Sequence, residues 1–192
     1  MPSKNSVKIY VEDSYYHIYN RGVEKRLIFQ DEQDYSVFLS YLKTYLLPKD
    51  EEELRKRLSD PNISYKEKDK LLKLLRLNNF YGEISLLAYC LMPNHFHFFI
   101  KQKSALSIDK IMQSLCTRYT MYFNRKYKRV GYLFQAVYKA VLIITELQFI
   151  HLSKYIHRQA LALQGETLQG WEEKQPCSFS DYLGLRQTKW VQ

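Results

Sequence analysis

The stretch EISLLAYCLMPNHFHFFIKQ, from Glu83 to Gln102, contains two apolar runs that only Pro93 and Asn94 separate. Two such runs around a Pro-Asn pair predict antiparallel strands joined by a tight turn and buried near it. Within the second run, residues two positions apart point to the same face of a strand, so His95 and His97 lie side by side. Two neighbouring imidazoles are either a pair of metal ligands or polar residues packed in the core, and the spacing alone leaves both readings open.

The segments around this strand pair alternate between strand-like and helical patterns. Before the strand pair we predict a strand at 15–21 that ends before Gly22, a helix that Asp31 caps and Pro48 ends, and an inserted helical hairpin at about 49–79. After the strand pair we predict a helix at 107–126, a strand after Gly131, and a last helix that begins with a Thr145–Gln148 capping box. The loop-like tail has Trp171, Phe179 and Tyr182 as expected anchors. This order predicts an α+β chain with an antiparallel sheet and helices mainly on one face.

The overall composition indicates a globular, basic protein. The chain has 192 residues, of which 46% are hydrophobic and 15% aromatic, and its net charge of +9 favours a polyanionic partner, nucleic acid before membrane. No apolar run approaches the roughly 20 residues that cross a bilayer, and the polar start does not resemble a signal peptide. The cysteines Cys90, Cys116 and Cys177 are scattered without metal-type spacing, which suits a reducing cytoplasm.

The inserted segment at about 49–79 differs in composition from its surroundings. Mixed charges dominate it, and its leucines recur at helical spacing along one side. A segment of this kind is either a solvated structural insertion or a surface that grips DNA or another partner.

The last helix offers chemistry that would complete a site with the histidine pair. His151, Tyr155 and Gln159 follow one another at intervals of four, so they share one stripe of that helix. A glutamine carbonyl oxygen can bind a hard cation, and a tyrosine one turn away would then lie near the metal. The alternative is that Tyr155 packs on the sheet, as many of the 17 tyrosines must.

A basic stretch without any Asp or Glu runs from Lys110 to Thr145, with aromatic residues interleaved. Cationic side chains neutralise phosphates and exposed rings stack on unpaired bases, so nucleic-acid contact is favoured over a merely solvated surface. The candidate DNA-binding residues are those of this stretch and of the turn after the first strand: Asn20, Arg21, Lys25, Arg26, Arg118, Arg125, Lys126, Lys128, Arg129 and Lys139.

Several motifs occur here in the order seen in a known family. YHIYNRG, LMPNHFHFFI, RYTMYFNRKYKRVGYLFQAVYKA and KYIHRQA resemble the IS200-like (Y1) transposases, and the CSFSDYLG tail resembles the REP-associated members of that family. The resemblance implies a ferredoxin-like fold over residues 13–185, interrupted by the insertion, with a tail at 186–192. One departure is Gln159-Ala160, where REP-associated members typically have Asn-Pro; the glutamine is similar to that of the insertion-sequence transposases and keeps an amide oxygen.

The resemblance also implies a mechanism. His95 and His97 would be the histidine pair of the HUH motif and Gln159 the third ligand of a Mg²⁺ or Mn²⁺ ion that polarises the scissile phosphate. Tyr155 would attack single-stranded DNA and form a 5′-phosphotyrosine, which stores the energy needed for rejoining. A phenol is mostly protonated at neutral pH, so the site must help remove its proton, with the cation, a water or His151 as candidates.

The sequence thus predicts a metal-dependent single-stranded DNA endonuclease and strand transferase that acts on hairpin or palindromic repeats, as a monomer or a homodimer. Two other functions remain open: a non-catalytic nucleic-acid-binding module of the same fold, and a metal-dependent nuclease in which water attacks.

Overall fold

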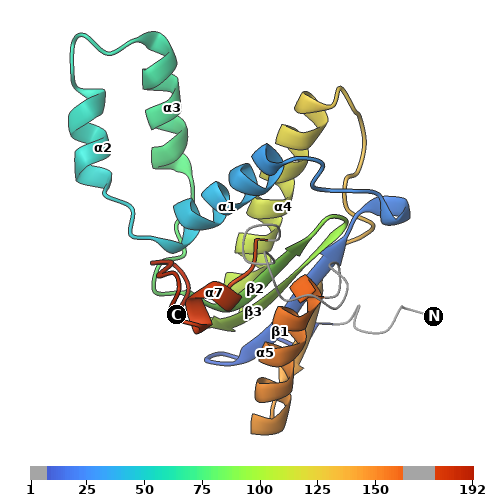
Figure 1. Cartoon of the computed structure of the whole chain (residues 1–192). Helices are drawn as coiled ribbons and strands as arrows, with labels where there is room; N and C mark the ends of the chain where they lie inside the picture. The colour runs from blue at the N-terminus through green and yellow to red at the C-terminus, as the bar shows by residue number, and fades with distance from the viewer. Residues whose placement is uncertain (1–7, 162–175) are drawn as a thin grey trace.

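The computed structural model describes residues 8–161 and 176–192. Its elements in chain order are β1 (Tyr15–Arg21), the short 3-10 helix η1 (Val23–Lys25), α1 (Glu32–Leu46), α2 (Glu51–Leu58), α3 (Tyr65–Arg76), β2 (Ile84–Met92), β3 (His95–Gln102), α4 (Ser107–Lys126), β4 (Lys139–Ile143), α5 (Glu146–Leu161) and α7 (Phe179–Tyr182). Figure 1 shows the helices arranged around one twisted sheet. The predicted α+β class is confirmed.

The sheet has four strands in the order β2-β3-β1-β4, and all three pairings are antiparallel. The strand pair around Pro93 and Asn94 forms as predicted, with Met92 opposite His95. Strand β1 lies in the middle of the sheet between β3 and β4, and its Tyr19 is opposite His97 on one side and Lys139 on the other. The middle position of β1 brings the residues of three strands together at one end of the sheet.

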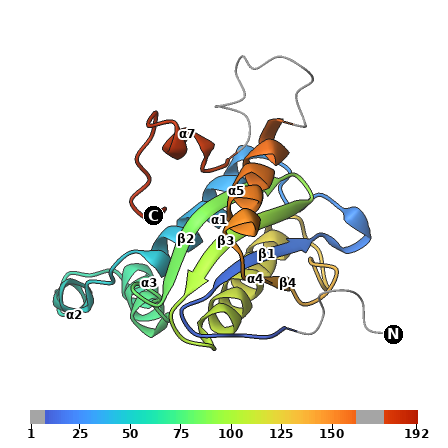
Figure 2. The ribbon, with the colours of Figure 1, turned by 90° about the horizontal axis from the view of Figure 1, so that it is seen from below.

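The two faces of the sheet carry different helices. Helices α1 and α4 cover one face, where Phe96 and Phe98 join the large core cluster. Helix α5 crosses the other face, where Phe99 packs with Leu152 and Ile156 in a smaller cluster (Figure 2). Because side chains alternate along a strand, the histidines of β3 share the face that α5 covers.

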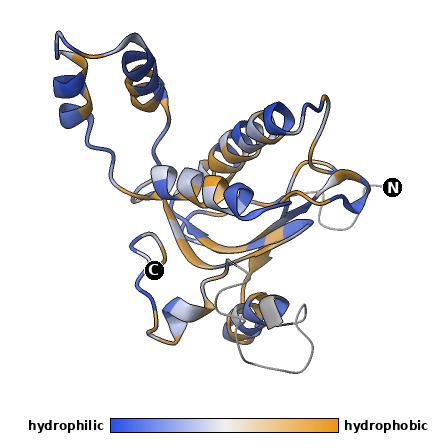
Figure 3. Ribbon diagram, turned by 45° about the horizontal axis from the view of Figure 1, so that its top comes forward, coloured by the Kyte–Doolittle hydropathy of each residue, from blue (hydrophilic) through white to orange (hydrophobic). Residues whose placement is uncertain are grey.

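Helices α2 and α3 form the predicted hairpin, which extends away from the sheet in Figure 1. Asp50 and Ser64 cap the two helices, and an ion pair between Arg57 and Glu67 at 2.7 Å links them. Only Leu71 is fully buried in either helix. Figure 3 shows hydrophobic residues concentrated along the sheet, whereas α2 is mostly hydrophilic. The hairpin is therefore a solvated arm with a thin core of its own.

The strand expected directly after Gly131 is shorter than predicted, because β4 begins only at Lys139. The preceding residues follow an irregular path, with Gly131 at a φ of 86°. The amide side chain of Asn20 donates to the carbonyl of Ala136 at 3.1 Å, so a side chain replaces the backbone partner that a longer strand would need. We call residues 132–138 the partition loop.

The C-terminal residues lie along the outer edge of β2. The backbone N–H of Leu91 donates to Pro176, that of Ser178 to Tyr89, and that of Gln192 to Leu86, each at 3.0 Å. Of the expected tail anchors, Phe179 packs in the smaller core cluster and Tyr182 donates its hydroxyl to the Leu87 carbonyl at 3.0 Å. Trp171 lies outside the described residues. These bonds cover an edge strand that would otherwise expose unpaired backbone groups.

Candidate active site

The two histidines of β3 lie together on the face of the sheet that α5 covers, with ring centroids 5.0 Å apart. The Nδ1 atom of His95 is 2.6 Å from the side-chain oxygen of Asn94, the second residue of the turn. The Nδ1 atom of His97 is 2.8 Å from Nε2 of His17 on the neighbouring strand β1. Since Nδ1 of His97 is engaged, Nε2 is the nitrogen that this ring has left for a ligand.

Helix α5 places Tyr155 against this pair. The phenol ring is edge-on to His97 with centroids 5.5 Å apart, and it is 5.9 Å from the ring of His17. The residue is 46% exposed, although Leu152 and Ile156 on the same helix are buried in the smaller core cluster. Burial of these neighbours fixes the rotation of α5 and leaves the phenol at the edge of the interface, where solvent and a substrate can reach it.

The other two residues of the predicted helical stripe differ in placement. Gln159, one turn after Tyr155, lies close enough to His95 for its side chain to influence the pKa of that imidazole. His151, one turn before Tyr155, is exposed to solvent. The structure thus brings Gln159 to the histidine pair. Besides His97, the imidazole that lies next to the phenol of Tyr155 is that of His17 and not that of His151.

A pocket of about 600 Å³ opens in front of these side chains. Tyr155, His95 and His97 line one side of it, and its remaining lining residues are Tyr19, Asn20, Arg21, Asn94, Gln135, Ala136, Val137 and Lys139. The lining includes two cationic side chains and no carboxylate. The Arg21 guanidinium is fixed by bonds of 3.0 and 2.8 Å to the Gln135 side-chain oxygen. A pocket with this charge suits an anionic group such as a phosphate.

The imidazoles of the site are neutral near pH 7. Burial, together with the nearby His17 and His95, lowers the pKa of His97 to about 3. Burial also lowers the pKa of His17 to about 4. The pKa of His95 is lowered by burial and by the positive charge of Arg21, while the side chain of Gln159 opposes the shift. Neutral imidazoles keep the lone pairs that a metal ion requires.

The imidazoles of His95 and His97 and the amide of Gln159 fit a divalent cation that keeps several coordination positions open for other ligands. Two imidazole nitrogens and the amide oxygen of Gln159 are all neutral donors, so they leave the charge of the ion available to a phosphate. No group of three or more His, Cys, Asp or Glu side chains suited to a metal ion occurs in residues 8–161 and 176–192. Besides His95 and His97, Gln159 is the residue that the sequence predicts as a ligand of such an ion.

The candidate DNA-binding residues do not form one cluster. Arg21 and Lys139 line the pocket, and Asn20 is buried in its wall. Lys25, Arg125 and Lys128 are exposed elsewhere, whereas four others have protein partners: Arg26 with Glu24 at 3.2 Å, Arg118 over the Tyr41 ring at 3.9 Å, Arg129 with Asn124 at 3.1 Å, and Lys126 with Asp31 and Asp34 at 2.7 and 2.8 Å. Their contribution to DNA binding stays a prediction.

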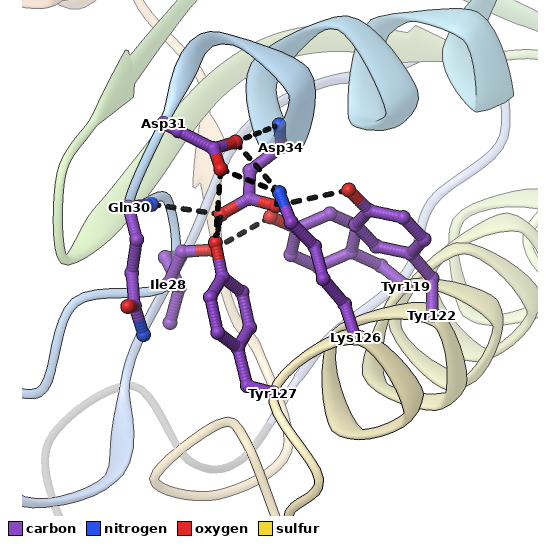
Figure 4. Close-up of polar contacts among 8 residues, drawn as sticks. All are labelled: Ile28, Gln30, Asp31, Asp34, Tyr119, Tyr122, Lys126 and Tyr127. Atoms are coloured by element: carbon purple, nitrogen blue, oxygen red, sulfur yellow. Dashed lines mark hydrogen bonds and ion pairs between the residues drawn. The ribbon is translucent and has the colours of Figure 1, made fainter.

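Lys126 belongs to a network around Asp34, which is completely buried (Figure 4). Besides Lys126, the carboxylate accepts hydrogen bonds from three groups: the backbone N–H of Gln30 at 2.8 Å, the Tyr122 hydroxyl at 3.0 Å and the Tyr127 hydroxyl at 2.8 Å. The network joins the start of α1 to the end of α4. It gives Lys126 a structural role on the face of the sheet opposite to the candidate site.

Comparison with known proteins indicates a DNA-cleaving transposase. The family model for "Transposase IS200 like" matches residues 55–159, more than half of the chain. The chain belongs to the IS200-like transposase family. No curated protein matches the sequence.

A solved structure of a REP-associated tyrosine transposase bound to a REP hairpin has a similar fold. It aligns with a TM-score of 0.55 over 97% of this chain and 90% of that chain, at 11% sequence identity. At this identity the likeness concerns the fold alone. No helix among the described residues is long and apolar enough to cross a membrane.

Sequence reasoning missed His17 and Asn94 as parts of the site. His17 is in the same strand as Asn20 and Arg21, and its alternation with Ile18 indicates which residues share its face. Its distance from His97 depends on the pairing of β1 with β3, which the sequence pattern does not specify. The sequence pattern indicates only a turn position for Asn94, although a turn residue beside a histidine can also fix the ring.

Proposed function

We propose that this transposase cleaves and rejoins single-stranded DNA with Tyr155 as the nucleophile, assisted by Mg²⁺ or Mn²⁺ at His95, His97 and Gln159. The observation that supports the proposal most directly is the meeting of Tyr155 with the histidine pair in one cationic pocket, although they come from α5 and β3. A tyrosine that served only to pack on the sheet would be buried, as Tyr16 and Tyr89 are.

In the proposed reaction the phenol oxygen attacks the phosphorus of a phosphodiester in the pocket. A bond forms between phosphorus and the tyrosine oxygen, and the bond to the 3′-oxygen breaks. The phenol gives up its proton and the departing 3′-oxygen gains one, so the products are a 5′-phosphotyrosine and a free 3′-hydroxyl. Reversal of these steps with another 3′-hydroxyl joins two strands without an external energy source.

The side chains around the pocket have separate roles in this reaction. Arg21 and Lys139 hold the non-bridging phosphate oxygens, and the bond of Arg21 to Gln135 keeps its guanidinium in place. The cation, when bound, polarises the phosphate and stabilises the charge that develops on it. Burial of Leu152 and Ile156 holds α5 so that the phenol stays at the pocket. This positioning lowers the entropic cost of reaching the transition state.

The proposed substrate is hairpin or palindromic-repeat DNA with an unpaired segment at the cleavage point. The REP-associated transposase of similar fold was solved with a REP hairpin, which supports this choice. The basic composition of the chain, with a net charge of +9, adds an attraction for any DNA backbone. The protein acts in this reaction either as a monomer or as a homodimer.

An adduct assay tests the function. The protein is incubated with labelled hairpin DNA carrying single-stranded flanks, with Mg²⁺, Mn²⁺ or EDTA, and the products are separated in SDS. We expect a covalent adduct in the wild type that requires the cation and is absent from the His95→Ala/His97→Ala variant, which should still bind the DNA. Cleavage without any adduct would identify water as the nucleophile, and binding without cleavage would indicate a non-catalytic module.

A further inference from the structure

A second, larger pocket of about 840 Å³ lies beside the candidate active site, between α4 and the partition loop. Its α4 wall includes Met112, Cys116 and Met121, and its opposite wall includes Tyr132 and Val137. The proposed reaction does not use this pocket. Its lining is mostly apolar. Exposed apolar surface does not improve the solubility of a chain whose net charge is +9, and it is typical of a binding site.

The two pockets share a wall. Asn20, Gln135, Ala136 and Val137 line both of them, so the backbone of the partition loop separates one from the other. This backbone is fixed to β1 by the bond from Asn20 to the Ala136 carbonyl at 3.1 Å and by the bond from the Gln135 N–H to the Arg21 carbonyl at 2.8 Å. The two pockets are therefore direct neighbours on either side of this loop.

The charges of the two pockets differ in a way that matches the two parts of a nucleotide. Among the residues that line the apolar pocket there is no Lys or Arg, and the only charged one is Asp109, which is bonded to Tyr10 and Tyr138 and lies 3.6 Å from Lys8. The candidate active site has the reverse pattern, with two cations and no carboxylate. A phosphate is thus favoured in the first pocket and an uncharged group in the second.

The exposed side chains at the rim of the apolar pocket suit a flat aromatic ligand. Tyr132 is 87% exposed, and Met121 and Val137 are each 69% exposed. The hydroxyl and amide groups of Thr117, Thr120 and Gln113 offer hydrogen bonds at the edge of such a ligand. An unpaired nucleobase combines an apolar face with polar edges, and stacking on an exposed ring is the usual way in which proteins hold one.

We propose that the pocket between α4 and the partition loop binds an unpaired nucleobase of the strand whose phosphate occupies the candidate active site. This inference rests on the proposed function, and it adds a base-binding subsite that positions the strand for attack by Tyr155. The base stacks on Tyr132, and the partition loop separates it from the reacting phosphate.

A cross-linking experiment tests the subsite without requiring cleavage. The probe is a DNA hairpin with single-stranded oligothymidine flanks in which the thymines are replaced by 5-iododeoxyuridine, bound in EDTA to the Tyr155→Phe variant of the full chain. Irradiation should link the flank to Tyr132, within the tryptic peptide that runs from Val130 to Lys139. Tyr65, which is 88% exposed on the arm, provides the control position and should not be linked.

A thermodynamic cycle of DNA-binding affinities, with one change in the DNA and one in the protein, provides the second measurement. Replacing the flanking nucleotides with abasic sites should weaken binding of the Tyr155→Phe variant roughly tenfold, which is the effect of losing one stacked base. The same DNA change should cost nothing further when Tyr132→Ala is added, and Tyr132→Phe should restore the difference because the ring is kept.

The outcomes separate the two proposals. Cross-linking at Tyr132 together with a lost abasic effect in Tyr132→Ala supports the base pocket, even if no Tyr155 adduct ever forms. The base-pocket proposal is overturned if Tyr132 is not linked, if the abasic effect persists in Tyr132→Ala, or if the hairpin does not bind. A Tyr155 adduct combined with any of these results would leave the proposed function intact and remove only the subsite.

Discussion

The Nε2 atom of His17 lies 2.8 Å from Nδ1 of His97, and the two rings stack with centroids 5.0 Å apart. Burial keeps both imidazoles neutral near pH 7, so an N–H of one ring donates a hydrogen bond to the unprotonated nitrogen of the other. When His97 is the donor, its Nε2 carries the lone pair that a metal ion requires. Partners of this kind orient metal-binding histidines in many sites.

We therefore predict that His17→Phe weakens the binding of Mn²⁺ by about 10- to 100-fold while leaving the fold intact. The phenylalanine keeps the ring stack on His97 but removes the hydrogen bond that selects the tautomer. Titration of Mn²⁺ followed by electron paramagnetic resonance measures the affinity directly. His151→Phe, the same change at an exposed position on α5, is the control and should bind Mn²⁺ as the wild type does. Equal affinities of the two variants would refute the role of His17.

The buried carboxylate of Asp34 predicts a large effect on stability. Asp34→Ala leaves Lys126 and the hydroxyls of Tyr122 and Tyr127 without their shared acceptor, so we expect the free energy of unfolding to fall by about 3–5 kcal/mol. Urea denaturation measures this loss. Asp31→Ala removes a more exposed partner of the same lysine and should cost clearly less. Similar losses in both variants would show that the network is not centred on Asp34.

We expect His157 to lower the stability of the protein in mild acid. Burial lowers its pKa to about 4, against 6.5 for a free imidazole, although the charge of Asp181 acts in the opposite direction. Between these values the unfolded chain binds a proton that the folded chain does not, so the free energy of unfolding falls as the pH falls through this window. At higher pH both states are neutral and the contribution is constant.

The comparison with His157→Gln isolates this contribution. The glutamine amide can keep the hydrogen bond to Ser178, which is 2.9 Å from the imidazole, but it does not titrate. Between about pH 7 and about pH 5 the wild type should lose roughly 2 kcal/mol more than the variant. His17 and His97 contribute with the same sign in both proteins, so their effects cancel in the difference. Parallel stability curves for the two proteins would contradict the prediction.

We expect Arg21 to contribute to the salt dependence of DNA binding. If its guanidinium contacts one phosphate of a single strand, Arg21→Gln should reduce the slope of log affinity against log salt by about 0.7 and should also slow cleavage. Fluorescence anisotropy at several salt concentrations gives the slope. The matched control is Lys68→Gln, which removes an exposed charge from α3 and should leave the slope unchanged. An unchanged slope in Arg21→Gln would place the phosphate elsewhere.

The features that the sequence predicts well are those with local causes. The turn at Pro93 and Asn94, the N-cap at Asp31 and the Thr145–Gln148 capping box all form as expected, because each depends on residues within a few positions of one another. The face shared by His95 and His97 also follows from strand geometry alone. The α+β class follows in turn from the order of these elements.

The features that the sequence does not predict depend on how distant segments meet. Strand β4 begins only at Lys139, and before it the Ala136 carbonyl accepts a hydrogen bond from the side chain of Asn20, more than a hundred residues earlier. His17 joins the site only through the register between β1 and β3. The role of Lys126 as the partner of Asp34 arises from the packing of α1 on α4, which a charge pattern along one helix does not reveal.

The central claim is that Tyr155 is the nucleophile, and mapping of the adduct tests it most directly. After reaction with hairpin DNA in Mn²⁺ and digestion with nuclease and trypsin, mass spectrometry should find a nucleotide 5′-phosphate on Tyr155, in the peptide that runs from Tyr155 to Arg158. Tyr19 lines the same pocket and is the matched control, so Tyr19→Phe should keep the adduct and Tyr155→Phe should lose it. An adduct on Tyr19, or cleavage that persists in Tyr155→Phe, would contradict the account.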